Sequence, residues 1–351
     1  MTRSRRAKKK EENKIYITKN EESFENFDSK VFHEYFSKNA AFGVLDIETT
    51  GLSPKYAGFV LGGLLVFSEG RFVMHQIFAE TQEEEAEALQ KYMELITPLD
   101  YVITYNGGRF DIPFLQSRLQ HHGLEGFTLP YNLDLYRLVN NFSDLRSRLP
   151  NLKQPTLENF MGLWQTREDE IDGGISVQLY FRYAGAYERG EELKDLRHKI
   201  LPHNHDDVLQ LYRLLKVIEK TDFHRAMSKY GFMVNDLVIT EIGFKGGRFC
   251  VRGKQCRDCT DFVMMSNDEV PVEMCFNAAA KSFEITLPLL KKNKIIFADL
   301  YKIRNKDKVE KLPAFAENYL VLADEGKKNF EAVNMLAAQL TGLAAEICGN
   351  C

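Results

Sequence analysis

Cysteine is absent from the first 249 residues of this 351-residue chain, and all six cysteines lie at or after position 250. Disulfide bonds therefore cannot hold the amino-terminal two thirds together, which fits a reducing compartment. No apolar run approaches the roughly 20 residues that span a bilayer. The first residues also lack the apolar core of a secretion signal. We therefore expect a cytoplasmic protein without a membrane partner.

A large net charge is also missing, since the formal value is −4 at pH 7. Residues 1–14 carry seven basic and two acidic side chains, whereas residues 15–230 carry 23 basic and 32 acidic ones. Such an acidic region is not typical of a general polyanion-binding domain. The basic start predicts a disordered leader, with electrostatic contact to phosphates as the alternative.

The chain is long enough for two domains. Apolar patterning predicts an α/β region with strands at 41–47, 59–67, 71–79 and 101–105, and helices at 83–96, 110–121 and 204–220. The first three strands are joined by short turns, so we expect them to pair antiparallel within a mixed sheet flanked by helices. No Gly-x-Gly-x-x-Gly follows the first strand, which weighs against a dinucleotide enzyme. We predict a tail at 1–30, the α/β domain at 31–230 and a smaller α+β unit at 231–351.

The predicted carboxyl-terminal unit contains two C-x-x-C pairs, Cys256 with Cys259 and Cys348 with Cys351. Two such pairs can form a tetrahedral zinc site, although free thiols and a redox pair stay open as alternatives. Residues 281–311 carry nine basic and four acidic side chains with aromatic residues among them. That mixture suits single-stranded nucleic acid, and an ordinary solvated surface explains it equally well.

The most informative feature is a pair of carboxylates, Asp46 and Glu48, at the end of the first predicted strand. Residues i and i+2 of a strand point to the same face. The two side chains therefore project to the same side of an apolar strand, just before a turn that contains Gly51. Two like charges held this close repel each other, and a hard divalent cation would relieve the repulsion. The sequence therefore predicts a metal-dependent enzyme.

Two further acidic segments complete the set. Asp111 begins a predicted helix after a strand and a glycine turn, and Asp207 lies four residues after His203 on one helix face. Together with the first pair, these carboxylates can hold two cations that activate water and clamp a phosphodiester. His203 is a candidate general base, because histidine titrates near neutral pH.

Three segments resemble the motifs of DEDD-type 3′–5′ exonucleases, namely Asp46-Ile-Glu-Thr-Thr-Gly51, Tyr105-Asn-Gly-Gly-Arg-Phe-Asp111 and His203-Asn-His-Asp-Asp207. The chain is most similar to the YprB-like branch of this ribonuclease H-like superfamily, over residues 42–220. Further similar segments at 132–136, 152–158 and 167–173 follow in the family's order. The resemblance implies a ribonuclease H-like fold, two Mg²⁺ or Mn²⁺ ions and the 3′ end of DNA or RNA as the partner.

By the same resemblance, the metal ligands are Asp46, Glu48, Asp111 and Asp207. The familiar subtypes place a tyrosine four residues, or a histidine five residues, before the last aspartate. His203 combines the first position with the second residue type, so the base is less firmly assigned than the ligands. His205 is the alternative, although a helix turns it away from Asp207.

Several neighbouring residues complete the prediction. Substrate contacts are expected from Thr49, Thr50, Gly51, Asn106 and Gly107. Asp206 is expected to be a solvated neighbour of Asp207, and Trp164 a core residue. Asp134 is assigned either to the site or to a structural loop.

The predicted function is a metal-dependent 3′–5′ exonuclease acting on single-stranded nucleic acid. A nucleic-acid-binding or scaffold protein with a vestigial nuclease fold is one alternative. A structure-specific endonuclease on the same fold is the other.

Overall fold

The structure is a computed structural model that describes residues 15–23, 25–163, 173–189, 194–257 and 259–348. The chain forms two compact units, and each draws on three separate segments. Unit 1 comprises Met1–Phe27, Asn39–Tyr136 and Asn151–Leu215, and unit 2 comprises Asp28–Lys38, Arg137–Pro150 and Lys216–Cys351. The predicted boundary at residue 231, between the α/β domain and the smaller carboxyl-terminal unit, stays a prediction.

Unit 1 contains a six-stranded sheet in the order β1-β4-β3-β2-β5-β6. Its strands are β1 (Tyr16–Glu22), β2 (Phe42–Thr49), β3 (Phe59–Ser68), β4 (Arg71–Phe78), β5 (Tyr101–Thr104) and β6 (Tyr131–Asp134). β2, β3 and β4 pair antiparallel as expected, whereas β2 with β5 and β5 with β6 pair parallel. The mixed sheet of the predicted fold class is therefore confirmed.

The edge strand β1 corrects the prediction that residues 1–30 form a disordered tail. Tyr16 to Glu22 pair antiparallel with β4 along their whole length, from Phe78 to Phe72. The strand was missed because its sequence, YITKNEE, has few apolar residues and most of its side chains are exposed. Main-chain hydrogen bonds to β4 hold it in place, and a sequence pattern does not reveal such bonds.

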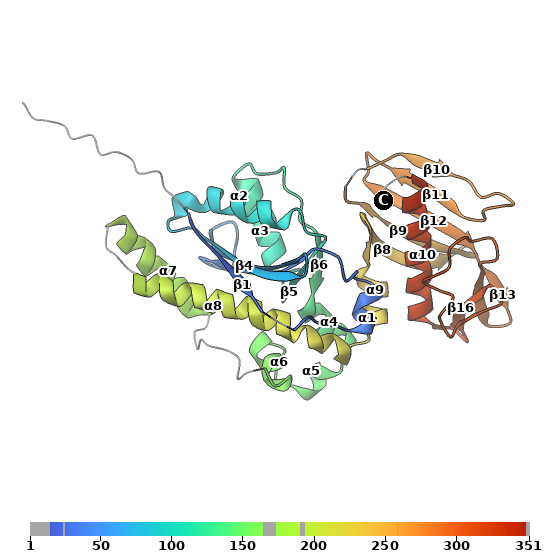
Figure 1. The fold of residues 1–351 in the computed structure, drawn as a ribbon, viewed down its shortest axis with the longest axis horizontal. Helices are drawn as coiled ribbons and strands as arrows, with labels where there is room; N and C mark the ends of the chain where they lie inside the picture. The colour runs from blue at the N-terminus through green and yellow to red at the C-terminus, as the bar shows by residue number, and fades with distance from the viewer. Residues whose placement is uncertain (1–14, 24, 164–172, 190–193, 258, 349–351) are drawn as a thin grey trace, which may run out of the picture. The chain divides into compact units, whose positions relative to one another are not determined.

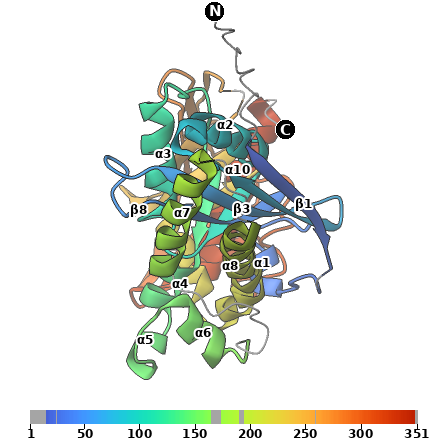
Figure 2. The same cartoon turned by 90° about the vertical axis from the view of Figure 1, so that its left-hand side faces the viewer.

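Helices cover both faces of this sheet (Figures 1 and 2). One face packs against α2 (Glu85–Ile96) and α3 (Asp111–His121), with Leu45 and Ile47 in the shared core. The opposite face packs against α7 (Gly173–Glu188) and α8 (Lys194–Arg213) through Leu61 and Phe78. The short elements are η1 (Gln82–Glu84), α6 (Gln154–Phe160) and η3 (Leu214–Lys220).

The helix α8 begins ten residues before the predicted start at 204 and gives way to a 3₁₀ segment after Arg213. The prediction was wrong because Pro202 lies inside the helix, and a proline inside a helical pattern usually marks an end. His203 and Asp207 therefore project from the middle of a continuous helix rather than from its first turn. Trp164 and residues 167–172 of the predicted segment 167–173 lie outside the described residues. Gly173 is described and begins α7.

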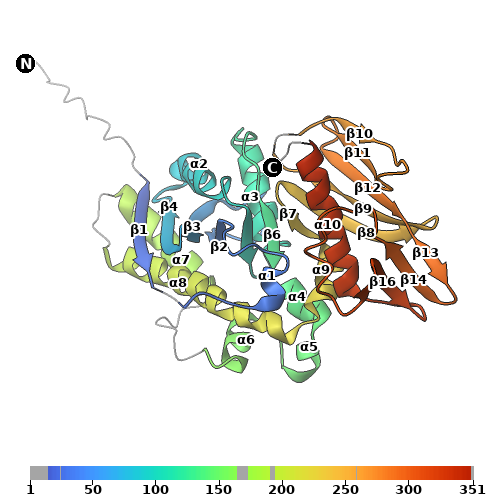
Figure 3. The same cartoon turned by 45° about the vertical axis from the view of Figure 1, so that its right-hand side comes forward.

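Unit 2 combines helices with two antiparallel sheets (Figure 3). The first sheet has the order β10-β11-β12-β9-β8-β7, with bounds β7 (Phe232–Val234), β8 (Leu237–Lys245), β9 (Arg248–Gln255), β10 (Phe262–Met264), β11 (Glu273–Asn277) and β12 (Ser282–Pro288). The second contains β13 (Leu290–Lys292), β14 (Ile295–Asp299), β15 (Phe315–Ala316), β16 (Tyr319–Asp324) and β17 (Lys327–Lys328). The sequence pattern had not revealed β9 and β11.

The helices of unit 2 are α1 (Lys30–His33), α5 (Leu145–Arg148), α9 (Phe223–Tyr230) and α10 (Phe330–Cys348), and α4 (Leu135–Phe142) carries the chain in from unit 1. The mostly buried helix α10 packs against β8, β12 and α9. The predicted α+β character of this region is confirmed. Among the described residues, no helix has the length and apolarity needed to cross a membrane.

Candidate active site

The carboxylates of β2 lie on the sheet face that α8 covers. Leu45 and Ile47 are buried in the core on the α2 side, whereas Asp46 and Glu48 alternate with them and are only partly buried. This alternation follows from the two-residue period of a strand. Asp46 and Glu48 therefore point to the same face of β2, as predicted.

The helix α8 reaches this face through Asn204, whose side chain is fully buried. Its Nδ2 lies 3.2 Å from both the main-chain oxygen and Oδ2 of Asp46. Its Oδ1 accepts a hydrogen bond of 3.2 Å from Gln76 Nε2, which also donates to the Leu201 carbonyl at 2.8 Å. Asn204 therefore fixes α8 to two strands at the level of Asp46.

One turn of α8 places His203 and Asp207 near Glu48. His203 Nε2 lies 3.7 Å from Glu48 Oε1 and 3.6 Å from Asp207 Oδ2. These three side chains offer ligand atoms within 4.8 Å of one another. The i and i+4 spacing of His203 and Asp207 thus acts as predicted, and it places both beside the end of β2.

Asp111 enters from α3 as the first residue of that helix and is 5% exposed. Its Oδ1 accepts a 3.3 Å hydrogen bond from the Ile47 N–H, between the two carboxylates of β2. The preceding turn is shaped by Asp134, which accepts from the N–H groups of Asn106 and Gly108 at 2.9 and 3.0 Å. Asp134 therefore shapes this turn, and its charge also raises the pKa of Asp111, so the two roles that the sequence allowed do not exclude each other.

Asn106 and Gly107 serve that same turn. Asn106 has a φ of 62°, a left-handed conformation that asparagine tolerates better than most residues. A Cβ on Gly107 would lie 2.4 Å from the Thr104 side chain. Their predicted contacts with substrate stay predictions.

Burial and mutual repulsion raise the proton affinity of this group. The pKa of Asp46 is raised well above its ordinary value by loss of hydration and then by the charges of Asp111, Asp207 and Glu48. Burial likewise raises the pKa of Asp111 to about 7, although hydrogen bonds from its own N–H and from Ile47 oppose the shift. The site is therefore short of positive charge.

We expect this charge imbalance to appear as a pH-dependent stability. The raised pKa values mean that the folded state binds more protons than the unfolded state between about pH 4 and 7, so stability falls as pH rises through this window. In EDTA, the free energy of unfolding measured with urea should be about 1–3 kcal/mol lower at pH 8 than at pH 5. The drop should shrink in Asp46→Asn/Asp111→Asn, and an equal drop in that variant would contradict the assignment.

Two glycines of β3 allow helices to approach both faces of the sheet. A Cβ on Gly62 would lie 2.6 Å from the Tyr92 ring of α2, and one on Gly63 would lie 2.2 Å from Asn204 Oδ1. Gly63 pairs directly with Asp46. The Asn204 amide therefore occupies the space that a side chain at position 63 would fill.

Gly63→Ala should push Asn204 away from Asp46 and lower the free energy of unfolding by about 1–3 kcal/mol, as overpacking does. Gly126→Ala is the control, because a Cβ there meets nothing within 4 Å. Denaturant unfolding measures both variants. Equal stability of Gly63→Ala and Gly126→Ala would show that α8 does not depend on this close approach.

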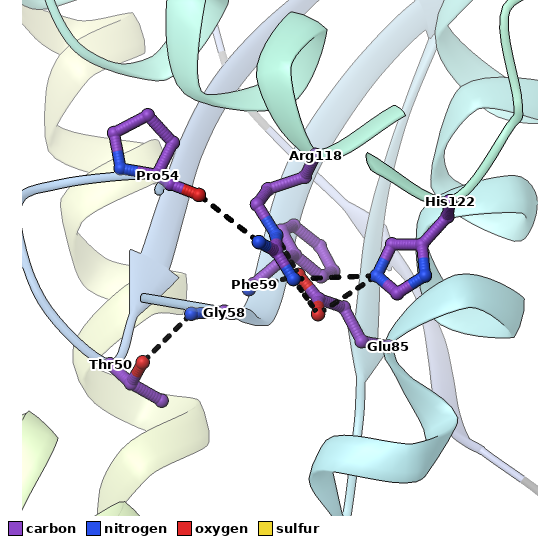
Figure 4. Close-up of polar contacts among 7 residues, drawn as sticks. All are labelled: Thr50, Pro54, Gly58, Phe59, Glu85, Arg118 and His122. Atoms are coloured by element: carbon purple, nitrogen blue, oxygen red, sulfur yellow. Dashed lines mark hydrogen bonds and ion pairs between the residues drawn. The ribbon is translucent and has the colours of Figure 1, made fainter. Parts of the chain in front are cut away.

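The loop at residues 50–58, which follows β2, is held by a buried ion pair (Figure 4). Arg118 donates to both oxygens of Glu85 at 2.7 and 2.6 Å and to the Pro54 carbonyl at 3.0 Å. Glu85 also accepts from the Phe59 N–H at 2.7 Å, and His122 Nε2 lies 3.0 Å from it. Burial opposes ionisation of Glu85, yet these hydrogen bonds outweigh it and hold its pKa below the usual range.

The threonines of the first motif also shape this loop. Thr49 Oγ1 donates to the Gly51 carbonyl at 2.9 Å, and Thr50 Oγ1 accepts from the Gly58 N–H at 2.8 Å. The predicted substrate contacts of Thr49, Thr50 and Gly51 stay predictions. The loop exposes Leu52 and Tyr56, at 85% and 83%, which the sequence prediction did not single out.

Two predictions about α8 have definite outcomes. His205 turns away from Asp207, as expected, and its Nε2 lies 3.1 Å from Glu22 of β1. Asp206 is 6% exposed rather than solvated, so that prediction was wrong. It lies 3.9 Å from His205 Nδ1, and this acidic neighbour and Glu22 raise the pKa of His205 despite its burial.

The cysteine pairs give no zinc geometry in the part of the chain that the structure describes. Cys256 is exposed, Cys259 contacts the Gln255 carbonyl at 3.7 Å, and Cys348 is partly buried. No group of three or more closely spaced metal-binding side chains among the described residues includes a cysteine. Cys351 lies outside those residues, so the four-cysteine zinc site stays a prediction.

The fold and the acidic cluster together define an α/β protein with a carboxylate site at the end of a central strand of a mixed sheet. The chain belongs to the RNase H superfamily, whose family model matches residues 44–219, half of its length. The predicted superfamily is thus confirmed. No curated protein matches the sequence.

The solved structures to which the chain is similar are remote in sequence. One is the family B DNA polymerase of the hyperthermophilic archaeon Pyrobaculum calidifontis, at 18% identity and a TM-score of 0.37, over 51% of this chain and 24% of that one. Another is E. coli exonuclease I in complex with a dT13 oligonucleotide, at 12% identity and a TM-score of 0.35, over 62% of this chain and 55% of that one. The chain thus spans about half or less of these proteins.

Proposed function

We propose that this protein is a metal-dependent nuclease that removes nucleotides from the 3′ end of single-stranded nucleic acid. The observation that carries the proposal is the convergence of Asp46, Glu48, Asp111 and Asp207, from β2, α3 and α8, beside His203. The raised pKa values of Asp46 and Asp111 and the mutual repulsion of the carboxylates fit oxygen-preferring divalent cations such as Mg²⁺ or Mn²⁺.

The four carboxylates are the proposed metal ligands. When bound, two divalent ions would supply a water of lowered pKa and stabilise the charge on the scissile phosphate. Asn204 and the Ile47 N–H hold Asp46 and Asp111 in one orientation, so the ligand oxygens are placed before any ion arrives. Such preorganisation is what a phosphodiester site requires.

His203 is the proposed general base. His203 is 5% exposed, and its Nε2 lies within 4 Å of both Glu48 and Asp207, where an imidazole can take a proton from water. Because His203 lies in mid-helix, its position relative to Asp207 is fixed. His205 is not suited to this role, since it lies against Glu22.

The proposal is tested with 5′-labelled single strands of matched DNA and RNA, each with a free or a blocked 3′ end. A ladder that shortens from the free 3′ end, and only with Mg²⁺ or Mn²⁺, is the expected result. Equal cleavage of the blocked strands would instead support an endonuclease. No cleavage and no Mn²⁺ uptake by calorimetry would support a binding or scaffold protein.

The matched variants are Glu48→Gln in the site and Glu94→Gln on the exposed face of α2. Both remove one carboxylate charge without changing side-chain size. Only Glu48→Gln should abolish cleavage. Equal activity of the two variants would exclude the proposed ligand set.

A further inference from the structure

A second cluster of side chains that can bind a metal belongs to unit 2. Glu34 caps the end of α1, His224 lies in the first turn of α9, and Glu331 lies in the first turn of α10. Their ligand atoms lie within 4.8 Å of one another, and all three side chains are partly buried. The sequence positions are so far apart that no local motif links them.

The cluster lacks enough hydrogen-bond donors for its acceptors. Glu34 Oε2 is sealed from solvent and has no hydrogen-bond partner. The nearest cationic candidate, His224 Nε2, lies 3.8 Å away, which is beyond hydrogen-bond length. Ligand atoms that share one ion at about 2.0–2.2 Å are themselves roughly 3–3.5 Å apart. The observed spacing is thus slightly wider than that of a loaded site.

The imidazole of His224 is fixed from its other side. Its Nδ1 lies 2.7 Å from the buried Tyr35 hydroxyl, which accepts a 2.9 Å hydrogen bond from Asn334 Nδ2. The hydroxyl oxygen has a second lone pair for an Nδ1–H. A cation beside Glu34 would select that tautomer, which leaves the Nε2 lone pair free, and a hydrogen bond to the distal nitrogen is the usual support of a metal-binding histidine.

Asn334 is a second buried side chain with an unpaired acceptor oxygen. Its side chain is fully buried, and its Nδ2 also donates to the His224 carbonyl at 2.6 Å. Its Oδ1 has no hydrogen-bond partner. Two buried acceptor oxygens around His224 therefore lack a donor, which is uncommon in folded proteins.

We propose that Glu34, His224 and Glu331 bind one divalent cation of the zinc class, independently of the proposed nuclease site. One imidazole nitrogen with two carboxylate oxygens is a ligand set that zinc accepts. The ion fastens segment 28–38 to α9 and α10. Its role is structural, since it joins three parts of unit 2 that are distant in the sequence.

The test uses the full chain in the Glu48→Gln/Asp207→Asn background, which removes both carboxylates of the Glu48–His203–Asp207 group, after treatment with a chelator. Calorimetric titration with Zn²⁺ alone should give one equivalent bound. Glu331→Gln should weaken this binding at least tenfold, whereas Glu346→Gln, an exposed glutamate of the same helix, should not. Cys256→Ser/Cys259→Ser should bind as before.

A second measurement keeps the test independent of folding defects. Zn²⁺ should slow hydrogen exchange of residues 28–38 in the background protein but not in Glu34→Gln or Glu331→Gln. Zinc uptake that survives Glu331→Gln, or disappears with the two cysteines, would overturn the proposal. Absence of any Zn²⁺ uptake would also overturn it.

Discussion

Replacing Asp46 with asparagine should reduce the proposed nuclease turnover by about 10³-fold or more, while the metal-free protein becomes more stable. Turnover falls because the carboxylate between Asn204 and Asp111 no longer holds an ion, and a loss of this size corresponds to about 4 kcal/mol of transition-state stabilisation. Stability rises by about 1–2 kcal/mol, because a charge that burial and three neighbouring carboxylates disfavour has been removed. Single-turnover cleavage and urea unfolding in EDTA measure the two effects.

The isosteric control is Asp144→Asn, which removes an exposed carboxylate paired with Arg148. Surface pairs of this kind contribute little, so neither turnover nor stability should change appreciably. Unchanged turnover in Asp46→Asn would contradict the proposed mechanism. A fall in turnover together with a fall in stability would indicate damage to the fold rather than loss of a metal ligand.

The second large effect is expected on stability, from Arg118→Met. Removal of the guanidinium leaves Glu85 buried and without its strongest donors, and breaking a buried pair in this way destabilises proteins by about 3–5 kcal/mol. The same change releases the Pro54 carbonyl and so loosens the loop at 50–58. Urea unfolding at pH 7 gives the free energy, and proteolysis of the loop gives the local effect.

Two comparisons separate this explanation from general loss of packing. Glu85→Leu/Arg118→Met removes both charges and should recover most of the stability, because no uncompensated charge remains. Lys91→Met breaks an exposed pair with Glu94 on the same helix and should change stability by less than about 1 kcal/mol. If the double variant is as unstable as Arg118→Met, the buried charge is not the cause.

The sequence predicted the elements whose periodicity is strong. β2, β3, β4, α2 and α3 lie within a few residues of their predicted bounds, because alternating or helical apolar patterns reflect burial on one face. The candidate ligands on β2 and α3 were also predicted, since a strand end and a helix start meet at one edge of such a sheet, whereas Asp207 lies in the middle of α8. Their common location near β2 follows from that topology.

Other parts of the site depend on contacts that no pattern encodes. Asn204, Gln76 and Gly63 come from three elements, and their hydrogen bonds and close approach exist only after α8 has packed on the sheet. The Gly62–Gly63 pair was the one available signal, because glycine in a strand often marks a close approach. Glu85 lies in the first turn of α2, where an acidic charge suits the helix dipole, whereas its partner Arg118 became visible only in the packed core.

The alternating segments of the two units also bear on the order of events during synthesis. Every segment of unit 1 has been made once Leu215 is added, so its sheet can close while the remaining 136 residues are still to come. Segment 28–38, which contains Glu34 and Tyr35, belongs to unit 2 and must wait for α10. At about 5–20 residues per second, synthesis from the end of segment 28–38 to the end of α10 takes roughly 15–60 s. During this interval the aromatic residues of segment 28–38 that end up buried lack their final partners in unit 2.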